Sequence, residues 1–232
     1  MTEPRLIVDA PREPARGIAL LLHGGRSASR DPVRATQLAV LRMRPFASAL
    51  RRARGGLVVT RLLYRMRGWN DGERSPVVDT CWALDTLAAR FPGQPIALVG
   101  HSMGARAALH VAAHDQVRAV VALAPWIEAG DPVSTLAARR VLIAHGDQDT
   151  RTDPGASREY ARAAEPIAGT ASFVRVVGDQ HAMLRRPRVW THLTTGFVLG
   201  ALLDDDAPHG HTDTHIRHAV SGALAGLPAV DV

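Results

Sequence analysis

The sequence predicts an α/β fold, in which a doubly wound, mostly parallel sheet is flanked by helices. Two observations predict it. Short, almost continuously apolar runs recur along the chain, and such runs are typical of strands buried on both faces of a parallel sheet. Longer stretches suited to helices separate them, and this alternation favours right-handed crossovers within one sheet. The length of 232 residues fits a single domain of this class.

The individual elements follow from these runs in chain order. Strands are expected at Ile18–Leu22, Leu57–Leu63, Ile96–Val99, Val117–Leu123, Val141–Ala144 and Phe173–Val177. Helices are expected at Val33–Arg54, Glu73–Arg90, Met103–His114, Pro154–Ala164 and Pro187–Leu203. The third of these helices is apolar almost all round, so it should be buried. Cys81 and Trp82 fall inside the second helix and are expected in the core.

Residues 1–203 are expected to form one domain, followed by a polar tail over residues 204–232 that ends in a short helix or a frayed segment. The tail holds four histidines, His209, His211, His215 and His218. The last two fall on one helix face. Dedicated metal sites draw their ligands from fixed elements with supporting contacts, so we interpret the tail as an adventitious metal binder and expect no metal site.

The charge balance is basic and depends on arginine alone. The chain has 28 Lys and Arg against 22 Asp and Glu, and none of the 28 is lysine. The segment from Arg26 to Arg67 contains eleven arginines and a single acidic residue, Asp31. This excess either binds an anionic substrate or is an ordinary solvated surface. No aromatic interleaving or nucleic-acid motif accompanies it, so no nucleic-acid partner is expected.

Cysteine content and hydropathy exclude several classes of protein. One cysteine, Cys81, rules out an intramolecular disulfide and a zinc site built mainly from thiolates. Met1–Asp9 lacks the basic and apolar regions of a secretory signal, and no apolar run is long enough for a membrane span. We therefore expect a cytoplasmic protein. The oligomeric state is not predicted.

The chemistry-bearing motif is Gly100-His101-Ser102-Met103-Gly104, which fits G-x-S-x-G. It follows an expected strand and precedes the buried helix, the strand–turn–helix context that this motif requires. The flanking glycines allow backbone segments to approach closely while the serine stays exposed. The helix N-terminus and the Met103 N–H then point towards any negative charge that develops on a substrate oxygen.

From Arg16 to Leu203 the sequence resembles the α/β-hydrolase superfamily, which supplies its catalytic residues in the order serine, acid, histidine after successive strands. The resemblance implies Ser102 as nucleophile and His181, in Gly178-Asp179-Gln180-His181, as base. Ala144-His145-Gly146-Asp147-Gln148-Asp149 resembles the acid loop, which favours Asp149 over Asp147 as the acid. The resemblance to this superfamily implies no cofactor.

His23-Gly24-Gly25 is similar to the loop that donates to the oxyanion in this superfamily. The resemblance implies that the backbone N–H of Gly25 joins that of Met103, with Arg26 as the competing donor. His23 and His101 match positions that shape these loops, and neither is assigned a catalytic role.

Glu128–Arg140 is too short for the helical lid that many relatives insert there. We therefore expect no large cap domain and an open site, as in small dienelactone-hydrolase-like esterases. Trp126, in a Pro-Trp pair similar to one in some polyester-cleaving relatives, either lines the substrate cleft or packs. Arg26 and Trp69 are further tentative cleft residues.

The leading hypothesis is a cofactor-independent serine hydrolase of carboxylic esters with small or medium acyl groups, working through an acyl-enzyme on Ser102. One alternative keeps this chemistry for a thioester, as an acyl-CoA thioesterase or acyltransferase. The other is a non-catalytic ligand-binding scaffold, because fold does not fix function. The expected partner is a small-molecule ester or thioester.

Overall fold

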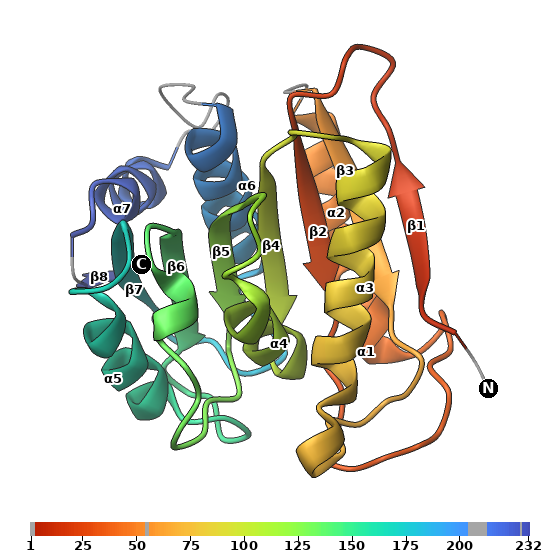
Figure 1. The fold of residues 1–232 in the computed structure, drawn as a ribbon. Helices are drawn as coiled ribbons and strands as arrows, with labels where there is room; N and C mark the ends of the chain where they lie inside the picture. Colours follow the sequence, from red (N-terminus) through yellow and green to blue (C-terminus); the bar gives the residue numbers. More distant parts are fainter. Residues whose placement is uncertain (1–2, 54–55, 204–212, 228) are drawn as a thin grey trace.

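The computed structural model describes residues 3–53, 56–203, 213–227 and 229–232, and within them it shows one twisted sheet between two layers of helices (Figure 1). The strand order is β1-β3-β2-β4-β5-β6-β7-β8. The first strand runs antiparallel to β3, and the other neighbouring pairs are parallel. The strands are β1 (Arg5–Asp9), β2 (Gly17–Leu22), β3 (Leu57–Leu63), β4 (Ile96–His101), β5 (Val117–Leu123), β6 (Arg140–Gly146), β7 (Thr170–Val176) and β8 (Ala229–Asp231).

The helices cover both faces of this sheet, as the predicted fold class requires. They are α1 (Leu38–Leu41), α2 (Arg44–Arg52), α3 (Ser75–Arg90), α4 (Met103–Val111), α5 (Pro154–Ala164), α6 (Pro187–Leu203) and α7 (Thr214–Leu224), with short 3-10 turns η1 (Asp71–Glu73) and η2 (Ser134–Leu136). Helices α3, α4 and α5 lie over one face, and α2, α6 and α7 over the other (Figure 1). The doubly wound prediction is confirmed.

Strand β2 shows why the central strands are continuously apolar. Its alternate residues Ile18, Leu20 and Leu22 join the core under α3 and α4, whereas Ala19 and Leu21 join the core under α2 and α6. Successive side chains of a strand point to opposite faces, so a strand covered on both sides needs apolar residues at every position.

The expected helix at Val33–Arg54 is replaced by two helices, and this prediction was wrong in extent. Helix α1 is a single turn, and α2 starts afresh with Pro45 in its first turn. Proline has no N–H to donate to the preceding turn, so it is tolerated at a helix start and breaks a helix interior. The resulting bend around Arg42 lies beside the predicted nucleophile, as described below.

The chain after residue 203 contributes to the core instead of forming only a polar tail. Helix α7 buries an apolar face that includes Ile216 and Val220, and β8 pairs with β7 at the sheet edge. His215 and His218 lie on the exposed side of α7, while His209 and His211 fall outside the described residues. The boundary expected at residue 203 is therefore corrected, because apolar side chains beyond it pack against the sheet.

Two smaller features complete the fold. Cys81 and Trp82 are exposed on the outer side of α3, so their expected burial was wrong. The connection from β5 to β6 contains only the short turn η2 among its described elements, which agrees with the expectation of no large cap. Within the described residues, no helix has both the length and the apolar character needed to cross a bilayer.

Candidate active site

Four loops that follow parallel strands meet at the carboxyl end of the sheet, because the carboxyl ends of parallel strands lie together. They follow β2, β4, β6 and β7 and carry Gly25, Ser102, Asp149 and His181. Ser102, His181, Gly24 and Gly25 line one cavity of about 280 Å³, which we call the serine cavity. These loops, which are widely separated in the sequence, thus contribute residues to one cavity.

Ser102 occupies a strained turn between β4 and α4. Its backbone angles are φ 54° and ψ −120°, outside the regions that a non-glycine residue normally adopts. A Cβ at Gly100 would overlap the backbone of Ala105, and one at Gly104 would overlap the carbonyl oxygens of Leu22 and His23. The two glycines of the motif are therefore required by close backbone packing, which holds the serine at the cavity.

Asp149 is the aspartate that contacts the predicted base. His181 Nδ1 donates to Asp149 Oδ2 across 2.8 Å, and the carboxylate is fully buried. Asp147 accepts instead from the Gly178 N–H, joining the acid loop to the histidine loop. The geometry thus separates the two candidates that the sequence left open.

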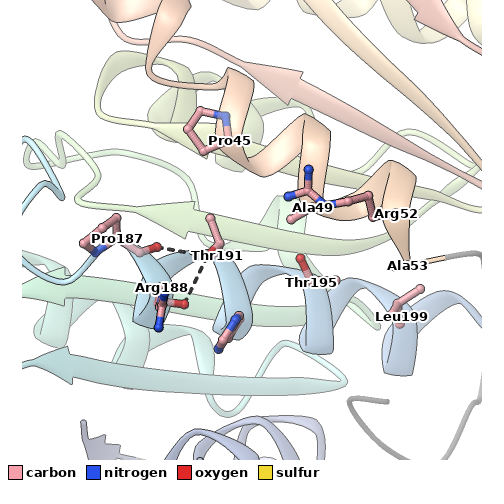
Figure 2. A pocket seen from close by; sticks show the side chains of 10 residues that line it. Pro45, Ala49, Arg52, Ala53, Pro187, Arg188, Thr191, Thr195 and Leu199 are labelled. Carbon is pink, nitrogen blue, oxygen red and sulfur yellow. Dashed lines mark hydrogen bonds between the residues drawn. The ribbon is translucent and has the colours of Figure 1, made fainter. Parts of the chain in front are cut away.

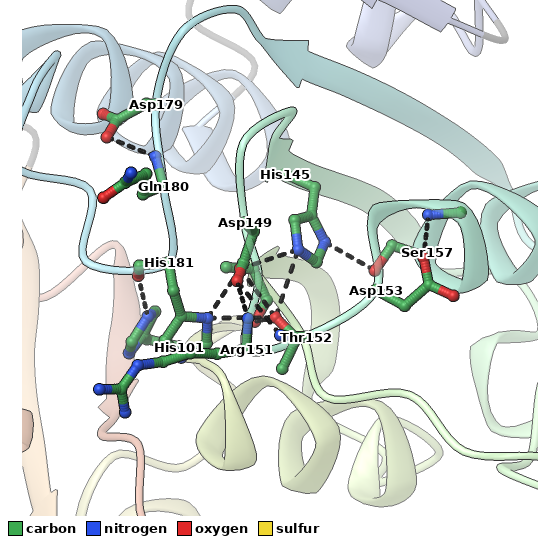
Figure 3. A network of polar contacts seen from close by, with 12 residues as sticks. His101, His145, Asp149, Arg151, Thr152, Asp153, Ser157, Asp179, Gln180 and His181 are labelled. Atoms are coloured by element: carbon green, nitrogen blue, oxygen red, sulfur yellow. Dashed lines mark hydrogen bonds and ion pairs between the residues drawn. The ribbon is translucent and has the colours of Figure 1, made fainter.

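The Asp149 carboxylate is part of a larger network that the sequence analysis did not assign (Figure 3). His145 Nε2 donates to its Oδ2 across 3.0 Å, and the Thr152 hydroxyl donates across 2.8 Å. Since Nε2 carries the hydrogen, Nδ1 of His145 accepts from the Ser157 hydroxyl. The signal in the sequence was a histidine four residues before the acid.

These contacts determine the charge state of Asp149. Burial alone would raise its pKa, but hydrogen bonds from His145, His181 and the Arg151 N–H, together with the nearby His181 charge, hold the pKa well below its usual value. The carboxylate therefore stays ionised, which lets it orient the His181 ring and stabilise its protonated form.

Gly25 and Met103, whose backbone N–H groups are the predicted oxyanion donors, pack against each other through the Met103 side chain. A Cβ on Gly25 would overlap the side chain of Met103 and the carbonyl oxygen of Arg67. The Arg26 N–H already donates to that carbonyl oxygen across 2.8 Å, so Gly25 is the better-placed donor of the two. Met103 is the first residue of α4, where N–H groups lack partners within the helix.

Two buried histidines form hydrogen bonds to the backbone of the loops that carry Gly25 and His181. His23 Nδ1 donates to the Gly24 carbonyl oxygen across 2.7 Å, and His101 Nε2 donates to the His181 carbonyl oxygen across 3.0 Å. Burial lowers the pKa of His23 to about 4, and burial followed by the nearby His181 charge lowers that of His101 to about 3. Both rings are therefore neutral, as loop-shaping residues rather than acids or bases.

The rings of the two tentative cleft tryptophans pack around Arg106, and the Trp126 N–H donates to the Ser102 carbonyl oxygen across 3.4 Å. Trp69 is 4% exposed, and the Arg106 guanidinium lies 4.3 Å from its ring centroid and 4.5 Å from that of Trp126. Arg106 pairs in turn with Asp131. Neither tryptophan is among the residues that line the serine cavity, and both rings pack against a cation, so their contact with a substrate stays a prediction. Arg26 does line an adjoining pocket with Gly24 and Gly25.

Two further cavities help to define the site. An apolar groove of about 320 Å³ shares Leu38, Arg42 and Ala182 with the serine cavity and continues along Leu41, Phe46, Met183 and Leu184. A different cavity of about 480 Å³ lies between α2 and α6 (Figure 2). Its lining contains none of the predicted catalytic side chains.

Comparisons with known proteins agree with this fold. A family model described as serine aminopeptidase, S33 (Hydrolase_4), matches residues 65–141, a segment that contains Ser102 and ends before Asp149. No curated protein matches the sequence.

Solved structures match over most of the chain. An alpha-beta serine hydrolase homologue from Coxiella burnetii is 20% identical, with a TM-score of 0.64 over 83% of this chain and 90% of its own. Est1E from Butyrivibrio proteoclasticus is 16% identical, with a TM-score of 0.67 over 86% and 95%. XC6422 from Xanthomonas campestris, an a/b serine hydrolase without lid, is 21% identical, with a TM-score of 0.60 over 82% and 86%. The sheet order, the two helical layers and these matches show that the chain has the α/β-hydrolase fold.

Proposed function

We propose that this protein is a serine hydrolase that cleaves carboxylic esters of small or medium acyl groups through an acyl-enzyme on Ser102. The observation that carries the proposal is the serine cavity itself, where Ser102 in a strained turn and a His181 ring bound to Asp149 line one space. A serine hydroxyl is a weak nucleophile unless a base removes its proton during attack.

The chemistry follows from the positions of these groups. The Ser102 oxygen attacks the ester carbonyl carbon while His181 Nε2 takes the hydroxyl proton. The carbonyl oxygen becomes negative and accepts hydrogen bonds from the Gly25 and Met103 N–H groups. The bond to the leaving alcohol then breaks, and His181 returns the proton to that alcohol. Water, deprotonated by the same histidine, releases the acid and restores Ser102.

The apolar groove supports an acyl chain of medium length. Its residues Leu38 and Leu184 are 76% and 71% exposed, and Leu38 also lines the serine cavity. An alkyl chain laid along the groove covers these side chains, and each buried methylene contributes about 0.8 kcal/mol. Esterases among the structural neighbours, such as Est1E with bound ferulic acid, are consistent with ester chemistry on this fold.

The decisive experiment tests Ser102 directly. The wild type should hydrolyse 4-nitrophenyl esters and should be labelled by a fluorophosphonate probe, whereas Ser102→Ala should lose both properties and keep its unfolding midpoint. Ser134→Ala, at a serine outside the cavity, serves as the matched control. Ester turnover that persists in Ser102→Ala, or a wild type that the probe does not label, contradicts the proposal.

A thioester substrate is the second candidate, favoured by the basic pocket next to the oxyanion loop, where Arg26 and Arg67 lie. Acyl-CoA turnover would then exceed turnover of a neutral ester with the same acyl group. It would also fall steeply with ionic strength, because salt screens exposed charges.

A further inference from the structure

Two arginines that the proposed mechanism does not use line the serine cavity. Arg42 lies just after α1, and Arg151 lies in the loop after β6, two residues beyond Asp149. Figure 3 shows the Arg151 side chain extending alongside the rings of His181 and His101. The bend that breaks the expected helix before Pro45 brings Arg42 to the same cavity. Two positive groups thus face one small space beside the nucleophile.

Arg42 lacks a partner for part of its guanidinium. Its Nη1 atom is fully buried and makes no hydrogen bond in the described structure. Arg42 and Arg151 line the same cavity, and burial, followed by the charge of Arg151, lowers the pKa of Arg42. A like-charged neighbour is costly, and an anion bound between the two side chains in the cavity relieves that cost.

Neither arginine takes part in an ion pair among the described residues. The arginines in those pairs are others, for example Arg65 with Asp79 and Arg106 with Asp131. Asp149 lies close to Arg151 in sequence but accepts its backbone N–H, not its guanidinium. Within the part of the chain that the structure describes, Arg42 and Arg151 therefore keep their charge free for a ligand.

We propose that the natural substrate carries an anionic group, a carboxylate or a phosphate, which binds Arg42 and Arg151 in the serine cavity. The inference rests on the proposed ester or thioester hydrolysis and names its substrate class. Guanidinium groups suit either anion because their planar donors bind two oxygens at once. Arg42 also borders the apolar groove, so the apolar part of the same substrate extends from this point along Leu38 and Phe46.

The test compares pairs of substrates that differ in charge. For a carboxylate, monomethyl glutarate is compared with methyl pentanoate by acid release. For a phosphate, butyryl-CoA is compared with S-butyryl pantetheine, which lacks the phosphates. The quantity measured is the ratio of kcat/KM for the charged and neutral members. Arg42→Gln and Arg151→Gln are compared with Arg44→Gln, an exposed arginine that lines none of these pockets.

We expect the wild type to prefer the charged member of one pair by tenfold or more. Each cavity variant should lower that ratio about tenfold, mainly through KM, while Arg44→Gln leaves it unchanged. The pair that responds identifies carboxylate or phosphate. A ratio that neither Arg42→Gln nor Arg151→Gln changes in either pair overturns the inference, even when neutral esters are hydrolysed.

A binding measurement separates this inference from the proposed function. Monomethyl glutarate and CoA are titrated calorimetrically into Ser102→Ala and into Ser102→Ala/Arg42→Gln. Binding that the second substitution weakens about tenfold supports the arginine site even when turnover fails. Absence of binding of both ligands to Ser102→Ala overturns it, while labelling of wild-type Ser102 by the fluorophosphonate probe would still support the hydrolase.

Discussion

His145 is the residue that most enlarges the predicted catalytic set. It is fully buried and donates to the same carboxylate oxygen of Asp149 that His181 uses. It does not line the serine cavity, so it acts through Asp149 as a positioning residue. A carboxylate with several donors is held in one rotamer, and His181 then has a fixed acceptor.

Replacing His145 by alanine should lower kcat about tenfold with little change in KM, because the Asp149 carboxylate loses a donor that fixes it. An Asp149 carboxylate with one donor fewer also interacts more strongly with a protonated His181, so the acid limb of the kcat/KM profile should move to higher pH. A pH–rate series on His145→Ala measures both effects. His145→Gln, which keeps a donor, should recover part of kcat. An unmoved acid limb would assign His145 a merely structural role.

Gly25 provides a second prediction at the residue scale. A methyl group at this position would overlap the Arg67 carbonyl oxygen and the Met103 side chain, so the oxyanion loop must shift. Since loss of one oxyanion donor costs about 10²–10³ in turnover, Gly25→Ala should lower kcat by about that factor. Steady-state kinetics on a 4-nitrophenyl ester provide the measurement.

Gly72→Ala is the matched control for Gly25→Ala. Gly72 lies in the turn η1, where an added Cβ meets no atom within 4 Å, and its φ is not positive. It should keep wild-type turnover. If Gly25→Ala were as active as Gly72→Ala, Gly25 would not be the donor.

At the scale of elements, the sequence predicts what depends on local pattern. The strands at Ile18–Leu22, Leu57–Leu63 and Val117–Leu123 are confirmed in place, because strands buried on both faces leave a strong apolar signal. Edge strands leave a weaker one. Strand β1 is short and flanked by charged residues, and β8 has three residues, so neither stood out from its surroundings.

Helix α7 gives the prediction at this scale. Ile216 is 3% exposed and packs in the core shared with α6, so Ile216→Ala should lower the free energy of unfolding by about 2–5 kcal/mol. Urea titration followed by circular dichroism measures this change. Leu184→Ala, at an exposed leucine, should change it by less than about 0.5 kcal/mol. Equal effects would mean that α7 does not contribute to the cooperative core.

At the scale of the whole molecule, two buried neutral histidines link folding to pH. The pKa of His23 is lowered to about 4 and that of His101 to about 3, both by burial first. In the unfolded chain each titrates near its ordinary value of about 6.5. Below that pH the unfolded state binds more protons, so stability is complete above pH 6.5 and decreases as the pH falls.

Each histidine should cost about 1 kcal/mol of stability by pH 5.5, with a further loss by pH 4.5. Urea titrations at pH 7.5, 5.5 and 4.5 measure this slope. In this range Asp149 stays largely ionised in both states, so the histidines dominate. His101→Gln, which keeps a donor for the His181 carbonyl oxygen, should flatten the dependence. An equally steep loss in that variant would place the proton uptake elsewhere.

The sequence by itself determined the fold class and the strand–turn–helix context of Ser102, because both depend on local patterns along the chain, whereas the order of serine, acid and histidine came from the resemblance to the α/β-hydrolase superfamily. Tertiary structure decided which groups meet. It separated Asp149 from Asp147, joined His145 to the acid, engaged Trp69 and Trp126 with Arg106, and brought Arg42 and Arg151 to one cavity. Apart from the His145–Asp149 pair, these contacts link residues far apart in sequence, and burial, which sets their cost and charge, exists only once the layers have packed.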